Sequence, residues 1–231
     1  MPPRRGRPPA VEATLRPEAI VAAALTIMRE DGLDGLTMSR VADRLAVRTA
    51  SLYWHVRNKE ELLDLLLDAV AGAQDLSEHV VEDDWRASLA AIMRAMRRHM
   101  LDHRDSARLF AGRFTTGPGQ LRYIETVLGV LRGAGLSKRD AAYAVFLVST
   151  FLIGFVGREQ APLSAAVSAG VSPRTYLDEL GARLAALPED GFPHIVELAA
   201  DLVAPDLDSR FEFALDRLLD GLEALRESGP G

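Results

Sequence analysis

Hydrophobic residues recur at the spacing of one helix face along most of this chain. The first such stripe lies between Pro17 and Gly32 and consists of Ile20, Ala24, Ile27 and Met28. A proline in the first turn and a glycine just past the last turn are typical helix boundaries. We find no convincing strand alternation and no internal repeat. The pattern therefore predicts an all-α protein.

A second stripe and a cap signal predict two short helices and a longer one before residue 71. Thr37 is a predicted N-cap. The stripe that follows it consists of Met38, Val41, Ala42 and Leu45. Residues 46–48 then separate this helix from a short one that begins at Thr49. Asn58, with Glu61 three residues later, resembles a capping box and opens a helix that ends at about Ala71.

Beyond a polar break at about 72–84, glycine and proline separate a further series of helices. The expected ranges are 85–104, 106–113, 120–132, 139–157, 173–187, 193–202 and 207–227. The longest apolar run, 143–157, is shorter than the roughly 18 residues that span a bilayer. We therefore expect a buried helix there, and no membrane association.

Composition and charge narrow the class of protein. The chain has 231 residues and no cysteine, which excludes disulfides, thiolate catalysis and cysteine-based zinc sites and fits a cytoplasmic location. Residues 1–60 hold 10 Lys and Arg against 7 Asp and Glu, whereas the remainder holds 17 against 26. The basic start and the apolar stretch 19–28 imitate a secretory signal, but charged residues 29–31 stand where a cleavage site would be. An acidic body with a basic head suits a protein that contacts a polyanion at one end.

The segment near residue 50 predicts a helix-turn-helix. Tyr53, Trp54 and His55 are consecutive, so they point in different directions and some must face outward. In a helix-turn-helix, the second of two short helices enters the major groove. Packing of Leu52 and Val56 against the preceding helix would leave five residues facing outward: Thr49, Ala50, Ser51, Tyr53 and His55. We expect Trp54 to be half-buried against a neighbouring helix.

The stretch LTMSRVADRLAVRTASLYWHVRNKEELL resembles the DNA-binding signature of the TetR family of transcriptional regulators, and the similarity covers residues 15–75. The resemblance implies a flexible basic arm at 1–14, a three-helix helix-turn-helix DNA-binding domain at 15–71, and a larger helical effector-binding and dimerisation domain at 72–231. It assigns DNA contacts to Thr37, Arg40, Arg48, Thr49, Ala50, Ser51, Tyr53, His55 and Lys59. Ala46 stands in the turn where many relatives have glycine, and a left-handed alanine costs about 1–2 kcal/mol.

Two features of the head have alternative interpretations. Helix-turn-helix geometry is not unique to DNA-binding proteins, so three amphipathic helices with an exposed aromatic residue would give the same pattern. The arm, with Arg4, Arg5 and Arg7, either enters an adjacent minor groove or is a solvated tail.

The last predicted helix carries a heptad seam: Phe211, Leu215, Leu218, Leu222 and Leu225. Such a seam packs either against a second copy or against the chain's own core. Two recognition helices about 34 Å apart require a two-fold dimer. The resemblance also implies that this helix and 139–157 form a four-helix interface. We therefore predict a homodimer.

Soft and aromatic side chains predict a pocket for a small-molecule effector in the body. Each of them also suits a core, but methionine fits adaptable binding surfaces, and the space between bundled helices is a common ligand site. The candidate lining residues are Met93, Met96, Met100, Phe110, Arg113, Phe114, Phe151, Phe155 and Arg158.

The body, over LDHRDSARLFAG and GLSKRDAAYAVFLVSTFLIGFV, resembles the tetracycline-binding repressors of the family. Where those proteins have the histidine that ligates magnesium, this chain has Phe110. Where they have a metal-linked glutamate, it has Arg158, with Glu159 next. A phenyl ring cannot ligate Mg²⁺, so we expect no metal or cofactor. We expect a large apolar or aromatic effector, whose anionic group, if any, would meet Arg113 or Arg158.

The sequence carries no catalytic motif. His99 and His103 have the spacing of helical zinc ligands, but Met100 stands where a zinc protease needs glutamate, so we expect a solvated or hydrogen-bonded face. No phosphate loop, GxSxG or GxGxxG is present. We therefore predict a ligand-responsive transcriptional regulator: a repressor that a hydrophobic effector releases from a palindromic operator. An activator with the same head, or a helical module that sequesters a hydrophobic compound, stays an alternative.

Overall fold

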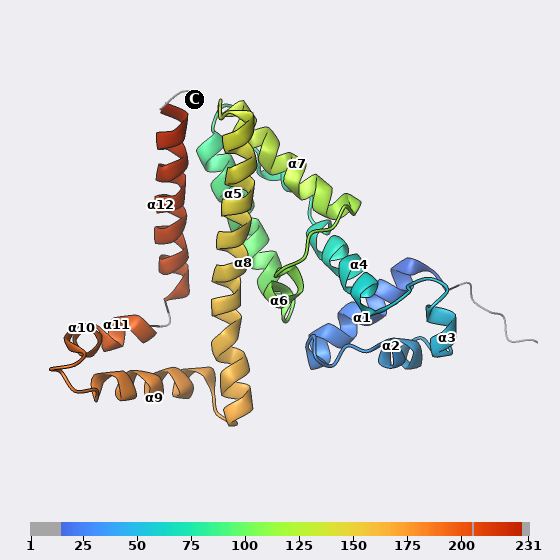
Figure 1. Cartoon of the computed structure of the whole chain (residues 1–231), viewed down its shortest axis with the longest axis horizontal. Coiled ribbons are helices and arrows are strands. Elements are labelled where there is room, and N and C mark those ends of the chain that lie inside the picture. The colour runs from blue at the N-terminus through green and yellow to red at the C-terminus, as the bar shows by residue number, and fades with distance from the viewer. Residues whose placement is uncertain (1–14, 205, 228–231) are drawn as a thin grey trace, which may run out of the picture. The chain divides into compact units, whose positions relative to one another are not determined.

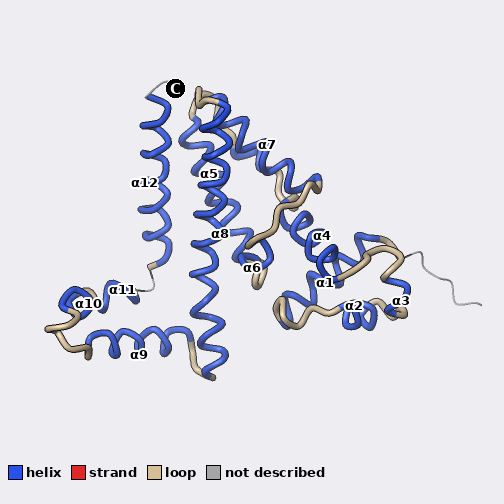
Figure 2. Tube along the Cα trace, in the orientation of Figure 1, coloured by secondary structure: helices blue, strands red, loops and turns tan. Residues whose placement is uncertain are grey.

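The structure is a computed structural model that describes residues 15–204 and 206–227, apart from the side chains of residues 162–165 and 167. Every regular element in these ranges is a helix and none is a strand (Figure 2), which confirms the predicted all-α class. The chain forms two compact units that meet in sequence between Leu66 and Leu67, inside helix α4 (Lys59–Ala71). The basic arm at 1–14 lies outside the described residues.

The first unit is the predicted three-helix head. It contains α1 (Pro17–Asp31), α2 (Met38–Arg44) and α3 (Thr49–Leu52), followed by the start of α4. The apolar stripes of these helices meet in one core, which includes Ile20, Ile27, Leu36, Val41, Leu52 and Val56. Thr37 caps α2 as predicted, because its hydroxyl accepts a hydrogen bond from the Arg40 backbone at 3.2 Å.

The turn between α2 and α3 contains the predicted left-handed alanine. Ala46 has φ of 54°. The turn is closed by two backbone bonds, from Ala46 to the Asp43 carbonyl at 3.1 Å and from Val47 to the Ala42 carbonyl at 3.0 Å. These bonds satisfy carbonyls at the end of α2 and offset the strain of the alanine.

The predicted capping box at α4 is only half correct. Asn58 Oδ1 accepts from the Glu61 backbone at 2.9 Å, as expected. The Glu61 carboxylate, however, accepts from the Arg57 backbone at 2.6 Å instead of returning to Asn58. The Arg57 guanidinium also pairs with Glu61, which favours this position of the carboxylate one residue earlier.

The second unit is the helical body (Figure 1). After the end of α4, its elements are the 3₁₀ turn η1 (Leu76–His79), α5 (Trp85–Leu101), α6 (Ser106–Phe110), α7 (Pro118–Gly133), α8 (Lys138–Ala169), α9 (Pro173–Ala185), α10 (Pro193–Glu197), α11 (Ala199–Val203) and α12 (Leu207–Glu227). Helices α5, α7 and α12 all pack against α8. Their shared core includes Leu89, Met93, Val127, Leu131, Val148, Leu152, Phe211 and Leu215.

Several helices of the body begin or end up to three residues away from the predicted positions, among them α5, which ends at Leu101, and α6, which ends at Phe110. Three differences are larger. Helix α8 continues 12 residues beyond Gly157 and runs through Pro162, because its alanine-rich end has a high helix propensity. The predicted polar break contains the turn η1, in which Asp75 caps the Ser77 backbone. The expected helix at 193–202 is divided into α10 and α11 at Leu198.

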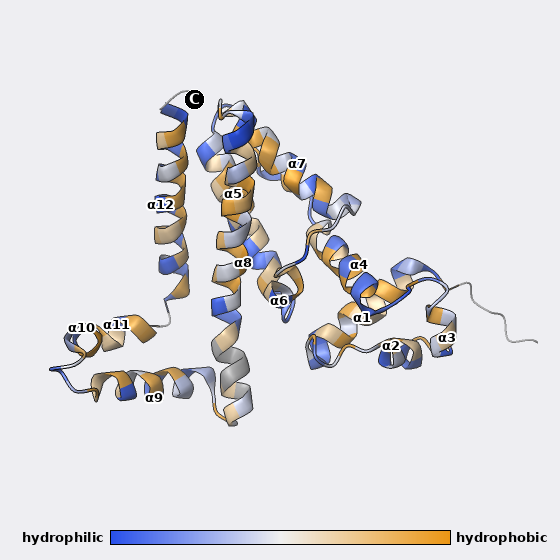
Figure 3. Ribbon diagram, in the orientation of Figure 1, coloured by the Kyte–Doolittle hydropathy of each residue, from blue (hydrophilic) through white to orange (hydrophobic). Residues whose placement is uncertain are grey.

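Helix α8 is less buried than expected. The stretch Lys138–Ala161 is long and apolar enough to cross a membrane by length and composition, and only 28% of its most apolar part is buried. The prediction of a short, buried helix is therefore wrong. The helix extends beyond the apolar run 143–157 from which it was predicted, and less than a third of its most apolar part is buried. Figure 3 shows the hydrophobic colouring along α8. Tyr143, Phe146 and Leu147 lie exposed on it.

A buried ion pair ties the body together where α5, α8 and α12 meet. The Arg97 guanidinium donates to the Glu159 carboxylate at 2.5 and 2.9 Å, and both side chains are almost fully buried. Arg97 also pairs with Asp208 at 2.8 Å and lies 4.6 Å from the centre of the Phe211 ring. The Glu159 carboxylate is therefore part of a structural ion pair.

Candidate DNA-binding surface and effector cavity

The short helix α3 presents its polar side outward. Leu52 and Val56 are fully buried, whereas Tyr53 is 50% exposed and His55 is exposed as well. Trp54 is 88% exposed, so the prediction that it is half-buried is wrong. The physical reason is that α3 ends at Leu52, so Trp54 lies in the turn that follows and not on a helix face.

The remaining predicted DNA contacts fall into two groups. Arg48 and Ala50 are exposed, and Thr49, Ser51 and Lys59 are partly exposed around them. Thr37 and Arg40 also have structural roles, because Thr37 caps α2, while Arg40 pairs with Asp31 and donates to the Gly35 carbonyl at 3.0 Å. The nine residues stay predictions. The exposed group on α3 and in the residues directly before and after it presents the hydroxyl, imidazole and guanidinium donors that DNA recognition uses.

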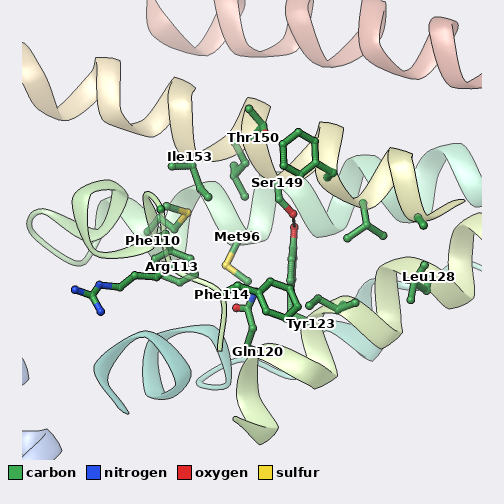
Figure 4. A pocket seen from close by; sticks show the side chains of 17 residues that line it. Met96, Phe110, Arg113, Phe114, Gln120, Tyr123, Leu128, Ser149, Thr150 and Ile153 are labelled. Atoms are coloured by element: carbon green, nitrogen blue, oxygen red, sulfur yellow. Dashed lines mark hydrogen bonds between the residues drawn. The ribbon is translucent and has the colours of Figure 1, made fainter. Parts of the chain in front are cut away.

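The body contains a cavity of about 500 Å³ between α5, α7 and α8, closed on one side by α6 and the loop after it (Figure 4). Five of the nine predicted lining residues contribute to it: Met96, Met100, Phe110, Arg113 and Phe114. Its walls are mainly apolar, and its volume lies within the range of small-molecule sites in proteins.

The other four predicted residues lie elsewhere. Met93 is buried in the core, and Arg158 is exposed. Phe151 and Phe155 pack against Phe211 with ring centres 5.7 and 5.2 Å away. Phe151, Phe155 and Arg158 occupy other faces of α8, whereas Met93 shares the face of Met96 and Met100 but lies closer to the start of α5 and is not part of the wall. The sequence cluster therefore does not form a single pocket.

Most of the cavity wall comes from residues that are not among the nine predicted ones. They are Gly112, Gln120, Tyr123, Ile124, Leu128, Ala142, Val145, Phe146, Ser149, Thr150, Leu152 and Ile153. On α8, Ala142, Val145, Ser149 and Ile153 recur every three or four residues, which is the spacing of one helix face. This periodicity could have predicted the cavity-facing side of α8, but the helix is apolar on several sides, so the sequence does not distinguish that side from the others.

Four polar side chains from α7 and α8 interrupt the apolar wall: Gln120, Tyr123, Ser149 and Thr150. The hydroxyls of Tyr123 and Ser149 share a hydrogen bond at 3.3 Å. Burial raises the pKa of the Tyr123 phenol, and the Ser149 hydrogen bond opposes the shift, so the phenol is neutral at physiological pH. The side-chain oxygen of Gln120 is buried and has no hydrogen-bond partner among the described residues. No carboxylate belongs to the part of the wall that the structure describes.

The cavity does not have the ligands of a magnesium site. Phe110 lies in the wall, and Glu159 is held by Arg97. Within the described ranges, no group of three His, Asp or Glu side chains is placed to hold a metal ion. His99 and His103 are both hydrogen-bonded, to the carbonyls of Val70 at 2.8 Å and of His99 at 2.9 Å, in agreement with the predicted hydrogen-bonded helix face.

The first turn of α7 is joined closely to the end of α4. The Asp68 carboxylate accepts from the Gln120 backbone at 2.9 Å and so caps α7, whose own cap residue Gly117 has no side chain to do so. Gly119 packs so tightly on Gly72 that a Cβ there would lie 2.1 Å from the Asp68 carbonyl oxygen. The helix that lines the cavity is therefore fixed directly to the helix that continues into the head.

Helix α12 uses much of its predicted seam for the chain's own core. Phe211, Leu215 and Leu222 are buried within this single chain, and Leu219 joins them. The alternative interpretation of the heptad seam, packing against the chain's own core, therefore applies to Phe211, Leu215 and Leu222. Leu218 is partly exposed and Leu225 is exposed, as is Phe213 on the other side of the helix.

Comparison with known proteins supports both units. The family model of "Bacterial regulatory proteins, tetR family" matches residues 20–66, and that of "Tetracyclin repressor-like, C-terminal domain" matches 80–226. Tetracycline repressor protein class A of Escherichia coli is 36% identical over 92% of each chain. HTH-type transcriptional repressor DrrR1 of Streptomyces coeruleorubidus is 32% identical over 96% of this chain and 81% of its own. The structure of ActR from Streptomyces coelicolor in complex with actinorhodin has a TM-score of 0.79 at 35% identity, covering 92% of this chain and 97% of ActR.

Proposed function

This chain belongs to the TetR family of bacterial regulatory proteins, and from that premise we propose that it represses transcription until an apolar, ring-containing effector occupies the cavity of its body. It is a DNA-binding transcriptional regulator of a non-enzymatic family. The observation that carries the effector part is the apolar cavity of about 500 Å³ between α5, α7 and α8. We place the protein in the cytoplasm, in solution.

The DNA-binding half of the proposal rests on the exposed side of α3 and on a homodimer. Two copies of α3 must lie about 34 Å apart to enter consecutive major grooves, and a two-fold axis provides that arrangement on a palindromic operator. The exposed apolar side chains available for pairing on α8 and α12 include Tyr143, Phe146, Leu147 and Leu225. A second copy would remove this surface from water, which accounts for an otherwise uncovered apolar helix.

The effector half rests on the chemistry of the cavity wall. Aromatic rings from Phe110, Tyr123 and Phe146 suit a flat ring system, and the described wall offers a metal–drug chelate no carboxylate or imidazole ligand. ActR, a relative of known structure, has been solved with actinorhodin and with (S)-DNPA, and a TetR variant from Acinetobacter baumannii AYE has been solved with minocycline. We expect this chain to respond to ring-containing compounds without needing Mg²⁺.

Release from DNA follows if the effector favours one of two conformations of the body. Because α4 is one continuous helix from Lys59 to Ala71, a shift of its last turn is transmitted along the same helix toward the head. An effector that binds better to the conformation in which the two recognition helices no longer fit the grooves removes the protein from DNA by population shift. The operator must then weaken effector binding by the same factor.

The experiment is a titration of the purified protein against a labelled duplex from upstream of its own gene. We expect dimer-stoichiometric binding that weakens with salt, and release by polycyclic aromatic compounds. Tetracycline with Mg²⁺ serves as the comparison. Release by that chelate alone would contradict the apolar effector, and absence of binding to the duplex at low salt would contradict the repressor and favour a sequestering module.

A further inference from the structure

We propose that the effector gives a hydrogen bond from a neutral hydroxyl to the side-chain oxygen of Gln120, and that this residue selects hydroxylated aromatic compounds over equally large compounds without a donor. The inference rests on the proposed function, since it concerns the same cavity. It adds the chemical group by which the cavity recognises its ligand.

The side chain of Gln120 carries a hydrogen-bond acceptor that lacks a donor. Gln120 lies in the first turn of α7 and lines the cavity (Figure 4). Its Oε1 is buried without a partner among the described residues. A buried acceptor without a hydrogen bond is destabilising and uncommon in folded proteins. A ligand donor that reaches Oε1 would remove this penalty, whereas a ligand without one would leave it in place.

The other polar groups of the wall do not supply that donor. The Tyr123 and Ser149 hydroxyls share a hydrogen bond at 3.3 Å. Neither they nor Thr150 and Arg113, the other polar residues of the wall, form a hydrogen bond with Gln120 Oε1. The remaining side chains of the wall are apolar and include Met96, Ile124 and Leu128. The donor must therefore come from a molecule that enters the cavity.

Charge in the cavity limits the kind of donor. A cationic donor such as an ammonium group would enter without a carboxylate to balance it, because none lines the described wall, whereas Arg113 brings a positive charge. Burial of a charge without a partner is costly. A phenolic or alcoholic hydroxyl donates without that cost, so the geometry favours a hydroxylated ring system.

The position of Gln120 is fixed by the fold. Its backbone donates to the Asp68 carboxylate at 2.9 Å, and the preceding Gly119 packs against Gly72. A hydrogen bond to Gln120 thus engages the point at which α7 is joined to α4. Recognition of the hydroxyl and transmission toward the head would then use the same residue.

The test compares anthraquinone, 2-hydroxyanthraquinone and 2-methoxyanthraquinone on the full chain, with binding measured by calorimetry. The methoxy compound keeps the oxygen but cannot donate, so it isolates the hydrogen bond. We expect the hydroxyl compound to bind about ten-fold more tightly than the methoxy compound. Gln120→Met should abolish this preference and raise the melting temperature of the free protein. Gln74→Met is the matched control, because Gln74 is partly buried outside this cavity, and it should leave the preference unchanged.

Three results would overturn the inference. Equal binding of the hydroxyl and methoxy compounds to the wild type would show that no donor is selected, while the ring-binding cavity itself would stand. A hydroxyl preference that survives in Gln120→Met would place the recognition elsewhere. Failure of all three compounds to bind would count against both this inference and the proposed aromatic effector.

Discussion

The contact between α4 and α7 gives a prediction whose size follows from the structure. In Gly119→Ala, the new Cβ would lie 2.1 Å from the Asp68 carbonyl oxygen and 2.8 and 2.9 Å from the Gly72 nitrogen and Cα. Ordinary contacts begin at 3.4 Å, so the two helices must separate by about 1.3 Å. All three atoms belong to the backbone, so no side chain can rotate away.

Two costs follow from this separation. Overpacking of a tight contact costs about 1–3 kcal/mol. The Asp68 cap on the Gln120 backbone, now 2.9 Å long, would also stretch beyond hydrogen-bond distance. Alanine regains part of this loss by its higher helix propensity. We expect a net loss of about 1–3 kcal/mol, which lowers the melting temperature by about 2–12 °C at this chain length.

The control is Gly129→Ala in the same helix, where a new Cβ meets nothing within 4 Å. It should be neutral or stabilise by up to about 1 kcal/mol, since glycine in a helix interior is unfavourable. Thermal unfolding followed by circular dichroism measures both variants. A Gly119→Ala protein that melts with the wild type or above it would refute the close approach of α4 and α7, and with it their direct coupling.

Three further predictions concern the head, the dimer and pH. Tyr53→Ala should weaken operator binding while the melting temperature stays unchanged, and a matching loss of stability would instead indicate packing. Leu147→Arg should convert a dimer to a monomer in sedimentation, whereas Leu121→Arg, similarly exposed but on α7, should not. Burial lowers the pKa of His99 below its ordinary value of 6.5, opposed in part by the hydrogen bond to Val70. As the pH falls through 6.5, His99 therefore binds a proton more readily in the unfolded chain than in the folded one. The free energy of unfolding should fall over this pH range, and His99→Gln should reduce its dependence on pH.

The sequence predicted best where a local signal decides the structure. Thr37, the left-handed Ala46 and the bounds of α12 all follow from caps, turn chemistry or a helical stripe. It predicted poorly where the length of a helix decides which way a side chain points. Trp54 is the clearest case, because only the end of α3 at Leu52 places it in the solvent. The capping box predicted at Asn58 is only half formed, because the Arg57 backbone donates to the Glu61 carboxylate in place of the Asn58 backbone.

Helix α8 explains why the cavity and the proposed dimer surface could not be told apart from the sequence. One side of α8 lines the cavity with Val145, Ser149 and Ile153, and a second packs Phe151 and Phe155 against α12. A third side leaves Tyr143 and Leu147 exposed. A helix that is apolar all round has no periodic stripe from which a single face can be read.

Such a helix normally lies buried on every side, whereas the residues that the structure describes cover only two sides of α8. We therefore infer that the third side pairs with an apolar surface from outside the chain. Leu225 is also exposed on α12, which packs against α8. Phe146 links this surface to the effector site, because it is 75% exposed and also lines the cavity. A second copy packed on α8 would thus complete the wall of the cavity at Phe146, so effector affinity should fall when Leu147→Arg prevents pairing, even though Leu147 does not line the cavity. Unchanged affinity in a monomeric Leu147→Arg protein would show that each chain forms its effector site alone.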